Sequence, residues 1–223
     1  MTKPTIWITR TQPAADVSAK AWADAGLTPV VLPLLAVTPV PNVTPPPDGS
    51  TLIFTSKNGV DHFSGCDFPI ICVGDATAAH ARAAGFTDVV SVDGTSADVT
   101  KWVKQNLPKT TQLTHVSGRH IRGTITEDLV AAGYNAARII VYRSQKIFPT
   151  PPSQIDYVAL YSPLAAEGFA QISDDWDCRD VTVLSISAAT DAQLGGRFTG
   201  RRYFAARPNE GAMLALLNPA STR

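Results

Sequence analysis

The chain repeats itself after roughly half its length. Residues 53–63 read IFTSKNGVDHF and residues 159–169 read ALYSPLAAEGF, so Ser162 follows Ser56 by 106 positions. An Ala-Gly pair before an apolar run recurs in the same way, at residues 25–26 and 132–133. This spacing is longer than the roughly 20 to 50 residues of a solenoid unit. The repeat predicts two similar α/β halves that face each other and bind a ligand in the cleft between them.

Short apolar runs alternate with helix-like segments along the chain. Residues 5–9 are rich in β-branched side chains, residues 13–25 are rich in Ala and end at Gly26, and residues 29–35 are extended again. This order predicts parallel sheets covered by helices, of doubly wound type, with about five strands each. The other expected strands lie near residues 51–54, 70–73, 88–91, 112–116, 157–160, 181–185 and 202–205, and the other helices near 57–63, 75–84, 96–105, 124–132, 164–172, 189–194 and 209–217.

Two proline-rich segments divide the chain. Residues 38–49 hold five prolines in twelve positions, and residues 142–152 also end in clustered prolines. Proline excludes a helix or a central strand, so both segments are expected to be stiff, extended joints. We therefore predict a discontinuous first domain (1–35 and 148–223), a second domain inserted into it (49–136), and a two-stranded antiparallel β ribbon between them (36–48 and 137–147). Leu34–Val40 would pair with Ile140–Ile147 in this ribbon, which would act as a hinge.

Composition excludes several classes of protein. Lys and Arg together number 19, as do Asp and Glu, so no overall charge favours nucleic acid or a membrane surface. Three cysteines without a CxxC pair argue against a disulfide framework or a zinc site. The N-terminus runs directly into a strand without a signal-peptide pattern, which predicts a cytoplasmic protein. Because both halves of the cleft would lie within one chain, we expect a monomer.

Small polar residues follow the apolar strands. In open parallel sheets ligands bind beyond the carboxyl ends of the strands, where free N–H groups of helix N-termini can hold carboxylate or phosphate. These residues could instead be ordinary helix N-caps. The basic segment 119–122 could pair with carboxylates or form a solvated loop. There is no Walker motif, GxGxxG or GxSxG, and the four histidines lack metal-ligand spacing, so no cofactor or metal is expected.

The ordered motifs resemble the uroporphyrinogen-III synthase family. They are ITR at 8–10, LIFTSKNGV at 52–60, VGDATA at 73–78, the Ser117-Gly118 turn, Ala132-Gly133 before Ile140-Val141-Tyr142, Tyr161-Ser162-Pro163, Thr190, and ARP at 206–208. The resemblance implies two α/β domains joined by a β ribbon. It also implies a cyclising lyase that acts without cofactor or metal on hydroxymethylbilane, loses water, and closes the ring with ring D inverted through a spiro intermediate.

The resemblance also assigns residues. Tyr142 matches the tyrosine that assists departure of the hydroxyl, although it could be a packing residue of the ribbon. The family commonly shows Gly-Pro-Thr-Thr where this chain has Ser187-Ala188-Ala189-Thr190, which changes how closely the backbone approaches a ligand. The expected substrate-binding residues are Arg10, Thr55, Ser56, Lys57, Asn58, Gly74, Thr77, Gly118, Arg119, Arg122, Ser162, Ser187 and Thr190. Two other interpretations remain: a non-catalytic two-domain module that binds or senses a small anion or a tetrapyrrole, and an interaction scaffold.

Overall fold

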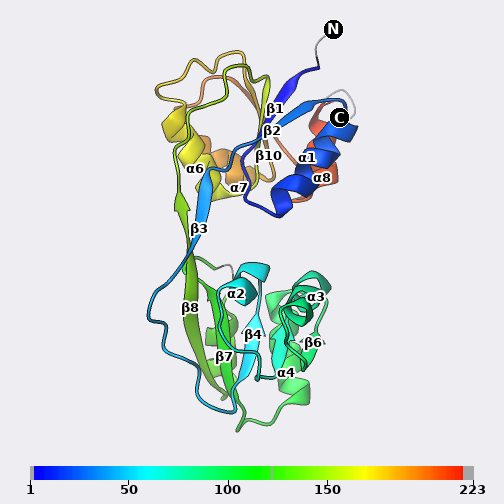
Figure 1. The fold of residues 1–223 in the computed structure, drawn as a ribbon, viewed down its shortest axis with the longest axis vertical. Coiled ribbons are helices and arrows are strands. Elements are labelled where there is room, and N and C mark those ends of the chain that lie inside the picture. The colour runs from blue at the N-terminus through cyan, green and yellow to red at the C-terminus, as the bar shows by residue number, and fades with distance from the viewer. Residues whose placement is uncertain (1–2, 122, 218–223) are drawn as a thin grey trace. The chain divides into compact units, whose positions relative to one another are not determined.

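The computed structural model describes residues 3–121 and 123–217. The chain divides into two units, each with its own sheet (Figure 1). Unit 1 consists of the chain up to Ala36 and from Gln145 onward, and unit 2 consists of Val37–Ser144. Unit 1 is thus built from both ends of the sequence, and unit 2 from the middle.

Unit 1 contains a five-stranded sheet in the order β11-β10-β9-β1-β2, with all neighbours parallel. The helices α1 and α8 cover one face, and α6 and α7 lie on the other (Figure 1). The strands are β1 (Thr5–Ile8), β2 (Thr28–Val31), β9 (Tyr157–Leu160), β10 (Thr182–Ser185) and β11 (Arg201–Phe204). The helices are α1 (Ala14–Asp24), α6 (Pro163–Ile172), α7 (Ala188–Asp191) and α8 (Glu210–Leu214), with short 3₁₀ turns η1 (Ala192–Leu194) and η2 (Ala215–Leu217).

The central strands of unit 1 are apolar on both faces. Successive side chains of a strand point to opposite faces, so a strand covered by helices on both sides reads as a continuous apolar run. Ile6 and Ile8 pack with Trp22 of α1, while Trp7 between them packs with Phe169 of α6. All five side chains are fully buried, which explains why β1 shows no polar alternation.

Unit 2 contains a six-stranded sheet in the order β3-β8-β7-β4-β5-β6. The helices α2 and α3 pack on one face, and α4 and α5 on the other. The strands are β3 (Leu35–Pro39), β4 (Thr51–Phe54), β5 (Ile70–Cys72), β6 (Val89–Ser91), β7 (Gln112–Gly118) and β8 (Asn135–Lys146). The helices are α2 (Lys57–Asp61), α3 (Asp75–Ala83), α4 (Ser96–Asn106) and α5 (Ile125–Ala131).

The repeat seen in the sequence corresponds to equivalent strands in the two sheets. At a shift of 106 or 107 residues, β9 matches β4 and β1 matches β7. The order β2-β1-β9-β10-β11 in unit 1 therefore equals the order β8-β7-β4-β5-β6 in unit 2. The repeated Ala-Gly pairs have the same structural role, because Gly26 and Gly133 follow α1 and α5 with φ of 94° and 82°, a conformation that favours glycine.

The sheet of unit 2 has the five expected parallel strands, and the strand expected in the ribbon, β3, joins them as a sixth. The long strand β8 pairs in parallel with β7 from Asn135 to Tyr142, and β3 adds a sixth strand on its other side. Backbone N–H groups of Val40 and Ile147 donate to the carbonyls of Val141 and Leu34, so β3 and β8 run in opposite directions. Residues 137–142, expected to be linker only, are therefore also part of the sheet.

Most other elements lie within a few residues of their expected positions. The segment 209–217 contains α8 and a 3₁₀ turn in place of one helix, and 189–194 is divided in the same way. Within residues 3–121 and 123–217, no helix is both long enough and apolar enough to span a bilayer.

Candidate functional site

The strand order of each sheet contains one switch point. In unit 1 the chain leaves β1 toward β2 on one side, whereas β9 leads to β10 on the other. In unit 2 the equivalent pair is β7 and β4. Helices on opposite faces diverge at such a point and leave a crevice beyond the strand carboxyl ends, where doubly wound proteins bind ligands. Residues after β1 and β9, and after β7 and β4, are therefore the first candidates.

Three of the expected serines occupy one backbone geometry. Ser56, Ser162 and Ser187 precede α2, α6 and α7 with φ of −156°, −157° and −163° and ψ of 154°, 154° and 162°. Each hydroxyl oxygen accepts a hydrogen bond from the backbone N–H three residues later. These serines are helix N-caps, and each hydroxyl proton remains available to donate to another acceptor.

Tyr142 lies at the switch point of unit 2. A register shift between β7 and β8 pairs Ser117 with Ile140 and Gly118 with Tyr142, so Val141 is the extra residue of a bulge. Both Val141 and Tyr142 consequently pack toward the face that carries α2. The Tyr142 hydroxyl lies 3.0 Å from Ser56 Oγ, so the phenol is held directly beyond the end of β4.

Gly118 allows this position of the tyrosine. A Cβ atom on residue 118 would lie 2.5 Å from two ring carbons of Tyr142, a distance that real contacts do not reach. Arg138 fixes the same turn, because its guanidinium donates to Ser117 Oγ and to the carbonyls of Gly118 and Arg119. The backbone N–H of Arg119 donates in turn to the Tyr142 carbonyl at 2.9 Å. The sequence indicated Gly118 but not Arg138, which reaches the turn at residues 117–119 only because β8 pairs with β7 in the folded sheet.

His62 is a second neighbour that the sequence did not identify. Its ring lies 5.6 Å from the Tyr142 ring, centroid to centroid, at an interplanar angle of 39°. Its Nδ1 lies 2.9 Å from the carbonyl oxygen of Asn58, which fixes the ring at the end of α2. The sequence showed only that the four histidines lack metal-ligand spacing, so it gave no signal that one ring lies beside the candidate catalytic tyrosine.

The switch point of unit 1 carries a hydrogen-bonded polar cluster. Arg10 follows β1, and its guanidinium carbon lies 4.5 Å from the centre of the Tyr161 ring at the end of β9. Arg10 Nη1 also lies 3.4 Å from the Glu210 carboxylate and 3.1 Å from Ser18 Oγ. Glu210 accepts from the Tyr161 hydroxyl at 2.7 Å and from the Ser18 hydroxyl at 2.9 Å. Arg10 is thus positioned at the edge of the sheet, partly exposed.

The loop before α3 in unit 2 differs from the equivalent loop before α7 in unit 1. Gly74 and Ser187 precede α3 and α7, and three residues later Thr77 and Thr190 donate backbone N–H groups to the respective carbonyls. Gly74 leaves open space where a side chain would be. Ser187 fills this position in unit 1, and its hydroxyl lies 3.1 Å from that of Thr190. Thr190 is fully buried and Thr77 nearly so, so both side chains help to shape their loops from within.

The remaining expected residues are placed as follows. Lys57 and Arg119 are exposed, Asn58 offers its carbonyl to His62, and Thr55 bonds to His115. Arg122 lies outside the described residues. In the described parts of the chain, no three His, Cys, Asp or Glu side chains gather closely enough to hold a metal ion.

His115 is buried beneath the edge of unit 2. Its ring nitrogens lie 3.3 Å from the hydroxyls of Thr55 and Thr126, so the imidazole joins the end of β4 to α5. Burial, with a smaller contribution from the nearby Arg138 charge, lowers the pKa of His115 to about 4. The ring is therefore neutral at pH 7 and serves to position Thr55.

This pKa predicts acid sensitivity. An unfolded histidine has a pKa near 6.5, so below that pH the unfolded chain binds a proton that the folded chain excludes. The free energy of unfolding should not depend on His115 above about pH 6.5, and should fall by up to about 3 kcal/mol as the pH decreases to 4. Urea unfolding at several pH values should show a flatter slope for His115→Gln. Exposed His120→Gln is the control, and an unchanged slope in His115→Gln would contradict this assignment.

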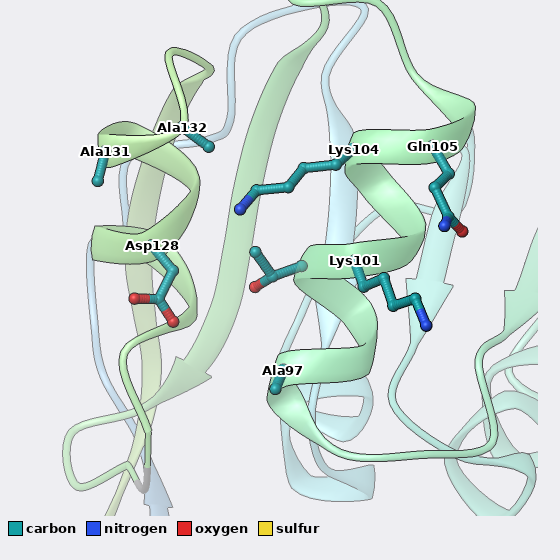
Figure 2. A pocket seen from close by; sticks show the side chains of 8 residues that line it. Ala97, Lys101, Lys104, Gln105, Asp128, Ala131 and Ala132 are labelled. Carbon is teal, nitrogen blue, oxygen red and sulfur yellow. The ribbon is translucent and has the colours of Figure 1, made fainter.

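A surface groove in unit 2 lies away from these residues. It has a volume of about 670 Å³ and runs between α4 and α5. Figure 2 shows Lys104 reaching from α4 toward α5, with Asp128 on the opposite wall. The groove is lined by Ala97, Thr100, Lys101, Lys104, Gln105, Asp128, Ala131 and Ala132, and includes none of the expected site residues.

Two doubly wound sheets that share a five-strand order, with hydroxyl and cationic side chains at their carboxyl edges, define a duplicated α/β fold. The sequence assigns a family within this class. The profile of uroporphyrinogen-III synthase HemD matches residues 16–215 of the 223 in the chain. The chain therefore belongs to the uroporphyrinogen-III synthase family, and the resemblance of its motifs is confirmed.

Solved structures agree with this fold. A uroporphyrinogen-III synthetase from Helicobacter pylori is 17% identical, with all of both chains covered and a TM-score of 0.65. A mutant uroporphyrinogen III synthase from Thermus thermophilus is 16% identical over 98% of each chain, with a TM-score of 0.50. No curated protein matches the chain at a significant level.

Proposed function

We propose that this chain closes hydroxymethylbilane to uroporphyrinogen III, losing water and inverting ring D. Family membership supports the reaction. One observation supports placing the reaction at this site. The Tyr142 hydroxyl is held 3.0 Å from Ser56 Oγ, beyond the switch point of a doubly wound sheet.

The first step, departure of the terminal hydroxyl as water, needs only a group that donates a hydrogen bond or proton to the leaving oxygen. The electron-rich terminal pyrrole pushes its electrons toward the hydroxymethyl carbon, the C–O bond breaks, and the oxygen leaves as water once it has accepted a proton. The Tyr142 hydroxyl, oriented by Ser56, is the group that we assign to this hydrogen bond. The azafulvenium that remains is then attacked by the substituted carbon of ring D, which gives the spiro intermediate. The older bond between that carbon and its methylene bridge then breaks, the bridge bonds to the free α-carbon of ring D, and the proton on that carbon is released, which leaves ring D inverted.

The outcome depends on the substrate's conformation. Spontaneous closure gives the non-inverted isomer I, so the protein must hold the chain in the shape that brings the substituted carbon of ring D to the cation. The acetate and propionate groups supply many carboxylates for this purpose. We assign them to Arg10, Lys57, Arg119 and Arg122 and to the hydroxyl and backbone N–H groups at Thr55, Ser56, Asn58, Gly74, Gly118, Ser162 and Ser187. The buried Thr77 and Thr190 contribute to substrate binding by shaping the loops that begin at Gly74 and Ser187.

We further infer that the chain works as a monomer of two domains, 1–35 with 148–223 and 49–136, joined by residues 36–48 and 137–147. The two compact units and the opposite directions of β3 and β8 support this division. The equivalent carboxyl edges of both sheets offer one set of substrate contacts in each domain.

Product analysis tests the proposal. The purified chain is supplied with hydroxymethylbilane, the products are oxidised, and the isomers are separated. We expect isomer III to dominate and to form faster than spontaneous closure. Isomer I alone, at the spontaneous rate, would reject the enzyme and leave the non-catalytic binding module as the better interpretation.

A further inference from the structure

Glu210 holds a carboxylate beside the Arg10 guanidinium, in a place that the proposed reaction does not use. It lies in the first turn of α8, and its side chain is 24% exposed. One carboxylate oxygen accepts from the Tyr161 hydroxyl, and the other from the Ser18 hydroxyl. These two donors belong to different elements, so they fix the position of the carboxylate before Arg10 is considered.

The Tyr161 hydroxyl is itself oriented by a buried side chain. The indole N–H of Trp22, a fully buried side chain of α1, donates to the Tyr161 hydroxyl at 2.8 Å. That oxygen therefore directs its own proton to Glu210. Burial raises the pKa of Tyr161 well above its usual value, so the phenol keeps this proton at neutral pH. The acceptor facing Arg10 is thus part of a preorganised network that includes a fully buried tryptophan.

Arg10 uses only part of its guanidinium in this network. Nη1 contacts Glu210 and Ser18, and the guanidinium carbon lies over the Tyr161 ring, 4.5 Å from its centre. Among residues 3–121 and 123–217, no hydrogen-bond acceptor is found for Nε or Nη2 of Arg10. A guanidinium held by one nitrogen and one ring face still offers two parallel N–H groups, the geometry that binds a carboxylate at both oxygens.

From these contacts we propose that Glu210 is a positioning residue, which holds Arg10 through Nη1 so that its free edge binds a carboxylate of the substrate. This inference rests on the proposed function. Without the negative charge at residue 210, Arg10 can leave the Tyr161 ring and its side chain becomes more mobile. Substrate binding then includes the cost of ordering that side chain, so KM rises, whereas the departure of water at Tyr142 is unaffected.

Steady-state kinetics with hydroxymethylbilane test the proposal. Glu210→Gln should raise KM about fivefold and leave kcat within twofold of the unaltered chain. Arg10→Gln should raise KM at least as much, and the double variant should show no higher KM than Arg10→Gln alone. Glu167→Gln is the matched control, because Glu167 also lies 3.4 Å from a cation, Lys146, and neither residue is assigned to the site. Its KM should stay unchanged.

Two results would overturn the proposal: an unchanged KM in Glu210→Gln, or a double variant whose KM increase is the product of the two single increases. If Glu210→Gln proves unstable by thermal unfolding, Glu210→Asp replaces it, since the shorter side chain keeps the charge but cannot reach Tyr161 and Arg10 together. Its KM should rise at least threefold. Formation of isomer III by the unaltered chain is measured separately, so failure of the reaction is distinguishable from failure of the Glu210 assignment.

Discussion

Replacing Tyr142 by phenylalanine should lower kcat at least tenfold while the protein stays folded. The substitution removes the one hydroxyl that we assign to the leaving oxygen, and a tenfold loss corresponds to about 1.4 kcal/mol of transition-state stabilisation. The ring that packs beside His62 and Gly118 is retained. Ser56 keeps its bond from the Gly59 N–H, so no capping interaction is lost. Turnover to isomer III and thermal unfolding are the two measurements.

Tyr134→Phe is the matched control in the same unit. The Tyr134 hydroxyl donates to the carbonyls of Val103 and Leu107 at the C-terminal end of α4. Its loss should reduce the free energy of unfolding by about 1 kcal/mol and leave kcat unchanged. Tyr142→Phe should show the opposite pattern. If Tyr142→Phe turned over at the normal rate, the tyrosine would be a packing residue and another donor would have to act on the hydroxyl.

Gly118→Ala should have the second large effect. The added methyl group would lie 2.5 Å from the Tyr142 ring, so the ring must move away from Ser56. We expect kcat to fall tenfold or more, and the free energy of unfolding to fall by about 1–3 kcal/mol, as in overpacked cores. Enzyme assays and urea unfolding of the same preparation measure both quantities.

Combining Gly118→Ala with Tyr142→Phe separates the effect on kcat from the effect on stability. In Tyr142→Phe the ring is still present but the hydroxyl is gone, so adding Gly118→Ala should again reduce stability but lower kcat little further. Gly196→Ala is the control, because the structure leaves at least 4 Å of open space around a Cβ at that position. Normal turnover in Gly118→Ala would show that the position of the Tyr142 ring does not limit the reaction.

The internal repeat allowed the fold to be predicted from the sequence. Nearly equal spacings, 106 residues from Ser56 to Ser162 and 107 between the Ala-Gly pairs, predicted equivalent structural positions. The matching N-cap angles and positive φ values agree with this. Continuous apolar runs such as residues 52–54 indicated strands buried on both faces. Local spacing and periodicity carry this kind of information because helices and strands have fixed repeats.

The side-chain contacts around the candidate site could not be predicted from sequence patterns. The bulge at Val141 depends on how β8 aligns with β7, and it is this bulge that turns Tyr142 toward Ser56. Arg138 and Glu210 are ordinary polar residues in the sequence, and their partners are distant along the chain. Sequence patterns predicted candidate strand ends, whereas tertiary pairing decides which side chains meet there.

The central claim is that the carboxyl edges of both sheets bind the tetrapyrrole. Nuclear magnetic resonance of isotope-labelled protein, titrated with uroporphyrinogen III kept reduced under anaerobic conditions, measures this directly. We predict that the amide signals of Ser56, Gly118 and Ser162 shift with a common saturation curve, while those of Ala97 and Ala131 in the α4–α5 groove stay in place. Shifts confined to that groove, with the three strand-end amides unmoved, would contradict the claim.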